Sequence, residues 1–327
     1  MSGPVVRYVL ILTVLLLAVS HYTVWPPDTM LMLTLLVCAG LGQFRAFTRH
    51  IVPFVVLFAL YSVASSLADD INPHVHYLPM AHFDKWLGGG HLPTSLLQDL
   101  LWNGHVRWYD YYFYVLYTAH FVAPVVLALF LWKRRGHLYW SYLTSLALLS
   151  LAAFLTYVLF PAAPPWMSSS YGYIEPIHRV SHDIWTAVGI DSPDTLYSKL
   201  SPNLVAAVPS LHSAFPLLIF VFLIRSFGLR RVWWAAFYPV SMWVGVVYLG
   251  EHYVFDVLCA IVFTAVAATA GTAIASRWTS LLPPPDGLEP SALPDGKAAS
   301  PKPHVVDDVP AVLHMPPADP KQRKPHD

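Results

Sequence analysis

The stretch Val208-Pro209-Ser210-Leu211-His212-Ser213-Ala214 places a histidine at the boundary of a long apolar run. Farther along the chain, Gly250-Glu251-His252-Tyr253-Val254-Phe255-Asp256 does the same. Ionisable groups at the ends of membrane helices are costly and tend to be functional. We therefore predict that the two stretches meet in one site at the edge of a membrane, and that the rest of the chain holds them there.

The composition is that of a membrane protein. The chain has 327 residues, of which 56% are hydrophobic and 12% charged, whereas a soluble domain carries about 25% charged residues. Runs of about 20 mostly apolar residues predict membrane helices over residues 5–23, 29–47, 50–67, 111–132, 138–160, 207–225, 232–250 and 253–276. The first run also resembles a signal peptide, but its length favours a retained helix. We expect an all-α fold, a polytopic helical bundle with about eight transmembrane helices.

Four parts of the chain differ in character. They are N-terminal transmembrane helices in 1–67, an outer-face loop in 68–110, a catalytic transmembrane core in 111–276 and a cytoplasmic tail in 277–327. Within the loop, an amphipathic stretch from Pro93 to Trp108, with leucines at helical spacing from Leu96 to Leu101, predicts a short interfacial helix lying on the membrane surface. The tail is rich in proline and has no apolar periodicity, so we expect it to be disordered.

The distribution of Lys and Arg predicts the orientation. With a cytoplasmic N-terminus, most basic residues fall on the inner side, and only Lys85, Arg107, Arg179 and Lys199 fall outside. We therefore expect a multi-pass protein of the cell membrane with both termini in the cytoplasm and both histidine stretches facing outside. No basic patch indicates a nucleic-acid partner. The sequence leaves the oligomeric state open.

His252 and Asp256 have the spacing of residues on one helix face. A carboxylate beside one imidazole nitrogen holds its proton there and leaves the other nitrogen free as a nucleophile. It also stabilises the cationic ring that follows attack. The other interpretation is a structural His–Asp pair at a helix end.

His212 follows a proline that suits the first turn of a helix. The free N–H groups of such a turn bind anions, and the Ser210 hydroxyl adds a donor. His212 can then protonate a leaving oxygen and later accept a proton from an incoming alcohol or water. Taken by itself, His212 is better explained as a lone interfacial histidine, and its pairing with the His252–Asp256 motif favours the functional interpretation. His120, inside the run 111–132, is either a functional group or a structural hydrogen-bonding residue.

Two pairs of motifs carry a resemblance to a known family. Pro209-Ser210-Leu211-His212 and His252-x-x-x-Asp256 resemble the second and third motifs of the type-2 phosphatidic acid phosphatase superfamily. Phe160-Pro161-Ala162-Ala163-Pro164-Pro165 and Glu251-His252-Tyr253 resemble its inositol phosphorylceramide synthase (inositolphosphotransferase) branch. The resemblance implies a helical membrane core, a phosphohistidine intermediate, no cofactor and no metal. By position, it makes His252 the nucleophile, Asp256 its orienting carboxylate and His212 the general acid/base.

The sequence departs from the family pattern in its cations. Many members have Ser-Arg where this chain has Gly245 and Val246, and Lys and Arg in a first motif that here is the region Pro161–Trp166. Phosphoryl transfer needs the charge on the transferred group neutralised. The predicted substrate-binding residues are Arg179 and Lys199, then Arg107, with Ser210 and His120 as further contacts. Otherwise backbone amides and a helix dipole hold the phosphate, or the site is inactive.

The resemblance implies an integral-membrane lipid phosphatase or phosphotransferase that acts on a lipid phosphate or phospho-headgroup. Water as acceptor makes it a phosphatase, and a polyol or lipid alcohol makes it a transferase, which the motifs favour slightly. Three other hypotheses stay open: a proton-coupled transporter, a non-catalytic lipid-binding membrane protein, and a zinc site formed by His212, His252 and Asp256.

Overall fold

The computed structural model describes residues 72–120, 122–189 and 203–278, all within one compact unit of the chain. These residues form helices joined by short connections, and no β-strand occurs among them apart from isolated bridges. The predicted all-α class is therefore confirmed. The predicted helices in 1–67 and the proline-rich tail from residue 279 onward lie outside the described residues.

Two long helices have the length and apolarity of membrane spans. They are α8 (Gly136–Leu159) and α15 (Val254–Trp278), which match the predicted runs 138–160 and 253–276. The two helices pack closely at Gly271, where an added Cβ would lie 2.6 Å from the backbone nitrogen of Ser145. A glycine is therefore required for these helices to pack as closely as they do.

The other runs of the core form shorter or broken helices. The run 111–132 divides into α6 (Trp108–Ala119) and α7 (Ala123–Arg134), which are bent by 54° relative to each other. Proline in the first turn of α7 starts a new helix there without costing a hydrogen bond. Among the described residues, two helices are long enough to span a membrane, or three if α6 and α7 count as one span. At least two spans are thus confirmed, and the total of about eight stays a prediction.

α12 (Leu211–Phe227) and α14 (Phe237–Tyr248) correspond to the runs 207–225 and 232–250. Each is shorter than the roughly 20 residues of a full span. Between them lie α13 (Leu229–Val232) and the 3-10 helix η1 (Trp233–Ala236). α12 packs into the main apolar cluster, where the Phe222 ring meets Tyr142 of α8 edge-on.

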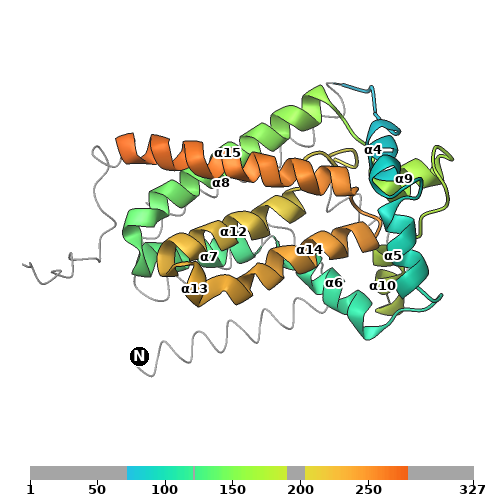
Figure 1. Ribbon diagram of the computed structural model, residues 1–327, viewed down its shortest axis with the longest axis horizontal. Helices are drawn as coiled ribbons and strands as arrows, with labels where there is room; N and C mark the ends of the chain where they lie inside the picture. Colours follow the sequence, from blue (N-terminus) through green and yellow to red (C-terminus); the bar gives the residue numbers. More distant parts are fainter. Residues whose placement is uncertain (1–71, 121, 190–202, 279–327) are drawn as a thin grey trace, which may run out of the picture. The chain divides into compact units, whose positions relative to one another are not determined.

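Four short helices gather at the end of the long helices where α12 and α15 begin (Figure 1). They are α4 (Pro79–Leu87), α5 (Pro93–Leu101), α9 (Pro165–Ser170) and α10 (Val180–Ala187). The predicted short helix in the 68–110 loop is α5, although it ends at Leu101. The leucines of α5 face two sides: Leu97 packs inside the protein, and Leu100 is 78% exposed. These helices surround the ends that carry both histidine motifs.

Candidate active site

The start of α15 brings His252 and Asp256 together. The helix begins at Val254, so His252 precedes it instead of lying on it as the sequence predicted. Asp256, in the first turn, accepts a hydrogen bond from the backbone N–H of Tyr253 at 2.9 Å. The same oxygen, Oδ2, lies 3.2 Å from Nδ1 of His252. The predicted contact is therefore present, but a capping carboxylate creates it and not a shared helix face.

A second buried carboxylate, Asp84 of α4, holds the same helix end. It accepts hydrogen bonds from the backbone N–H groups of Val254 and Phe255, at 2.8 and 2.9 Å. Burial raises the pKa of Asp84 to about 6, against the lowering effect of these two hydrogen bonds. Asp84 and Asp256 together occupy the first N–H groups of α15, so this terminus is not an anion site. Sequence reasoning missed Asp84 because its partners lie 170 residues away.

The start of α12 presents the second histidine. Ser210 is the N-cap, and its side chain accepts a hydrogen bond from the Ser213 N–H at 3.2 Å. Pro209 precedes the cap, so the expectation that it lies in the first helical turn was wrong. Ser210 N–H donates to the backbone oxygen of Asp256 at 3.3 Å, which ties the two helix ends together. The first-turn amides of Leu211 and His212 occupy positions at which helices bind anions.

The two histidines are in direct contact. His212 Nδ1 lies 3.2 Å from His252 Nε2; His252 is buried and His212 is partly buried. Because Asp256 accepts from Nδ1 of His252, the network assigns the proton of this ring to Nδ1 and leaves Nε2 as the acceptor. His212 Nδ1 is then the donor. The arrangement is an oriented imidazole lone pair with a second imidazole beside it, which is suited to nucleophilic attack with proton transfer.

His120 and Tyr117 pack on His212. The Tyr117 ring stacks on His212 with a centroid distance of 4.0 Å, and the His120 centroid lies 3.9 Å from that of His212. His120 Nδ1 lies 2.6 Å from the Tyr117 carbonyl oxygen and donates to it. The predicted residue His120 is therefore at the site, and it has the structural hydrogen bond that was its other interpretation. Tyr117 was missed, since an aromatic run in a membrane helix does not indicate which ring stacks on a histidine.

Of the predicted cations that lie within the described residues, Arg179 alone comes near the histidines. Its Nε lies 3.2 Å from Oε1 of Glu251, the residue before His252. Arg107 is instead the N-cap of α6, and its Nε donates to Asn103. Its position is roughly 15 Å along the helix axis from Tyr117, the residue that stacks on His212. Lys199 lies outside the described residues.

The positions of the family's Ser-Arg pair are closed to large side chains. Val246 has no exposed surface. A Cβ added to Gly245 would lie 2.8 Å from the ring of Phe113 on α6. The missing arginine is therefore replaced by close packing of α14 against α6, and a cation has to come from another element.

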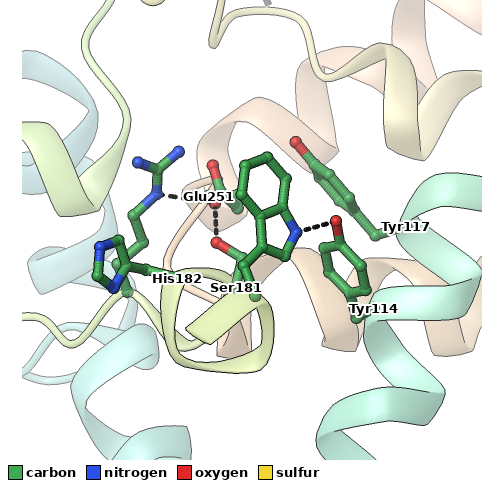
Figure 2. A pocket seen from close by; sticks show the side chains of 7 residues that line it. Tyr114, Tyr117, Ser181, His182 and Glu251 are labelled. Atoms are coloured by element: carbon green, nitrogen blue, oxygen red, sulfur yellow. Dashed lines mark hydrogen bonds and ion pairs between the residues drawn. The ribbon is translucent and has the colours of Figure 1, made fainter. Parts of the chain in front are cut away.

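A cleft lined by Arg179 shares Tyr117 with the surroundings of His212. We call it the Arg179 cleft, and its lining residues are Tyr114, Tyr117, Arg179, Ser181, His182, Trp185 and Glu251. Ser181 donates to Oε1 of Glu251 at 2.5 Å, and the Trp185 indole donates to the Tyr114 hydroxyl. In Figure 2 the two tyrosines form one side of the cleft and His182 lies on the other. The sequence did not indicate that Ser181 and Trp185 line a cleft, or that Glu251 forms an ion pair with Arg179.

The zinc hypothesis does not fit the geometry. Asp256 and His212 contact opposite nitrogens of the His252 ring, so the three side chains do not converge on one point. Across the described ranges, no group of three or more His, Cys, Asp or Glu side chains is arranged to hold a metal ion.

The chain is similar to several known proteins. Phosphoinositol dihydroceramide synthase of Bacteroides thetaiotaomicron is 30% identical over 157 residues, which are 45% of this chain and 50% of that protein. Inositol phosphorylceramide synthase of Candida albicans is 26% identical over 222 residues, 63% of this chain and 44% of that protein. Inositolphosphotransferase 1 of Saccharomyces cerevisiae is 32% identical over 137 residues, 38% and 25% of the two chains. The chain thus spans half or less of the length of these relatives, and no solved structure matches it.

The family profile described as PAP2 superfamily matches residues 78–270. This match covers more than half of the chain and includes both histidine motifs. It begins at residue 78, well before the first of the quoted motifs, and therefore takes in Asp84 and α4. The family predicted from the motifs is confirmed, and the chain belongs to the PAP2 superfamily.

Proposed function

We propose that this chain is an integral-membrane lipid phosphotransferase that moves a phospho-headgroup, of the inositol-phosphate kind, from one lipid to the alcohol of another. The observation that carries the proposal is the hydrogen-bonded series Asp256–His252–His212, with contacts of 3.2 Å on both nitrogens of the central ring. The relatives support a transferase, since their names describe synthases and transferases of inositol-containing headgroups.

The first step forms a phosphohistidine. Nε2 of His252 attacks the phosphorus, and the P–O bond to the donor lipid breaks. His212, protonated on both ring nitrogens when the donor is bound, gives its Nδ1 proton to the leaving lipid alkoxide and becomes neutral, while Asp256 stabilises the positive charge that develops on the His252 ring. In the substrate-free site the two histidine nitrogens touch, so an entering phosphoryl group has to separate the rings.

The second step regenerates the enzyme. The acceptor alcohol gives its proton to Nδ1 of His212, and its oxygen attacks the phosphorus. The N–P bond to His252 breaks, and the headgroup phosphate leaves on the acceptor. If water takes the place of the alcohol, the same residues hydrolyse the donor. The acceptor therefore decides between transfer and hydrolysis, and the histidines serve both reactions.

The α12 terminus holds the phosphate in this proposal. The amides of Leu211 and His212, with the Ser210 hydroxyl, supply donors beside His212, and the helix dipole favours negative charge there. This compensates for the arginine that Val246 replaces. The start of α15 is unsuited to the task because Asp84 and Asp256 occupy its amides.

The orientation is part of the proposal. The helices α7, α12 and α15 all end in basic residues, among them Lys133, Arg225 and Arg277. The histidine pair lies at the starts of α12 and α15, which is the other end of these helices. The positive-inside rule then places the basic ends in the cytoplasm and the histidines on the extracytoplasmic face of the cell membrane.

The proposal is tested with purified full-length protein in detergent, a phosphatidylinositol donor and a lipid alcohol acceptor. We expect the headgroup phosphate to appear on the acceptor, and His252→Ala to abolish this product. The matched control is His137→Ala, an exposed histidine at the start of α8, which should retain wild-type transfer. Free inositol phosphate in place of the lipid product would make the protein a hydrolase. Full transfer by His252→Ala would exclude His252 as the nucleophile.

A further inference from the structure

We infer that the Arg179 cleft binds the uncharged polyol ring of the donor headgroup, and that Glu251 determines the specificity for it. The inference rests on the proposed function and deepens it, because it assigns the part of the substrate that lies beyond the phosphate. The ligand class is a cyclic polyol such as inositol.

The position of the cleft supports this assignment. Tyr117 lines the cleft and also stacks on His212, while Glu251 lines it and directly precedes His252. The cleft therefore shares two walls with the histidine pair. In the donor lipid, the headgroup ring is joined to the phosphorus through one oxygen. If the phosphorus lies between the two histidines, the ring therefore lies next to Tyr117 and Glu251.

The charge of the cleft argues against a phosphate there. Arg179 pairs with the Glu251 carboxylate, whose side chain is 3% exposed, and its guanidinium lies 3.9 Å from the centre of the Trp166 ring. Burial strengthens such a pair. The arginine charge is thus compensated, and the Glu251 carboxylate repels an anion. The positive charge of Arg179 likewise repels a cationic headgroup. The aromatic walls by themselves would suit an ammonium group.

The hydrogen-bonding groups of the cleft suit hydroxyls. Arg179 and Ser181 both donate to Oε1 of Glu251. Glu251 lines the cleft, and its carboxylate can accept further hydrogen bonds from ligand hydroxyls; charge-assisted bonds of this type are strong. The Ser181 oxygen and the guanidinium add an acceptor and donors. Tyr114 and Tyr117 offer apolar faces to the C–H side of a ring.

The test compares donors that differ only in the headgroup. Initial rates of transfer are measured for phosphatidylinositol and phosphatidylglycerol with wild type and Glu251→Gln. The amide keeps the size of the side chain but removes its charge. We expect the ratio of kcat/KM values, inositol over glycerol, to fall about 10- to 100-fold, mainly through KM. Ser181→Ala, a milder change, should shift the ratio in the same direction.

The matched control is Glu175→Gln. Glu175 is ion-paired with Lys85 at 2.6 Å and does not line the cleft, so its variant should leave the ratio unchanged. Equal losses with both donors in Glu251→Gln would show that Glu251 only supports His252, and would overturn the inference. A wild-type preference for phosphatidylethanolamine would overturn it as well, since the cleft would then select a cation.

A binding measurement separates this inference from the proposed function. In the His252→Ala background, phosphatidylinositol should raise the melting temperature more than phosphatidic acid does, and added Glu251→Gln should remove the difference. This result is expected even if the protein hydrolyses its donor instead of transferring the headgroup. Equal stabilisation by the two lipids would refute polyol recognition, whatever the reaction.

Discussion

Replacing Asp256 by asparagine tests the orientation of the nucleophile most directly. The carboxylate has no exposed surface, and its Oδ2 serves both Tyr253 and His252. Asparagine can place its amide oxygen there, in which case the charge is lost and an NH2 group is buried. It can instead place the NH2 group there, which forces the proton of His252 onto Nε2 and removes the attacking lone pair. Both arrangements slow phosphorylation.

The contact distance gives the magnitude. Two unit charges 3.2 Å apart interact by about 5 kcal/mol at an effective dielectric constant of about 20. The positive charge in the transition state is shared over the imidazole ring, so we expect a loss of about 3 to 5 kcal/mol. At about 1.36 kcal/mol per decade, the rate of phosphohistidine formation should fall about 10²- to 10⁴-fold.

The assay is single-turnover labelling of the purified protein by a donor labelled in its phosphate. The matched control is Asp84→Asn, which alters another fully buried carboxylate that caps the same helix but does not touch a histidine. Both variants should lose some stability, and only Asp256→Asn should lose the phosphorylation rate. A rate for Asp256→Asn within tenfold of wild type would refute the role assigned to the carboxylate. An equal loss of phosphorylation rate in both variants would show that Asp256 acts only by capping α15.

Three further predictions follow from single contacts. His212→Ala should abolish transfer yet still give a one-equivalent burst of nitrophenol from a nitrophenyl phosphate donor, because that leaving group needs no proton; the absence of a burst would contradict the acid role. Gly271→Ala should destabilise the protein by about 1 to 3 kcal/mol, since its Cβ would lie 2.6 Å from Ser145, and an unchanged melting temperature would contradict the α8–α15 packing. For Asp84→Asn, the stability of wild type relative to the variant should grow as pH falls from about 7 to 4. The pKa of Asp84 in the folded state, about 6, lies above the ordinary value of 3.8, so the folded state takes up the proton first as pH falls. A difference in unfolding free energy between wild type and variant that does not change with pH would contradict this.

Local sequence patterns were sufficient for the helical class and for the central contact of the site. Apolar runs predicted α8 and α15 because helix formation in a membrane depends on length and apolarity. The spacing of His252 and Asp256 predicted their contact, which is present at 3.2 Å. Spacing alone could not distinguish a helix face from a capped helix start, since both bring these side chains together. The motifs on the two helices were specific enough to predict the family.

The tertiary structure decided everything that joins distant parts of the chain. Asp84 reaches the start of α15 across 170 residues, and Arg179 reaches Glu251 across 72. The break between α6 and α7 brings His120 to His212, although the apolar run through it looks continuous in sequence. Local propensity and periodicity act over a few residues, whereas these contacts depend on how whole helices pack. The sequence by itself therefore determined the family and predicted the contact of His252 with Asp256, and only packing decided which charges and aromatic rings surround them.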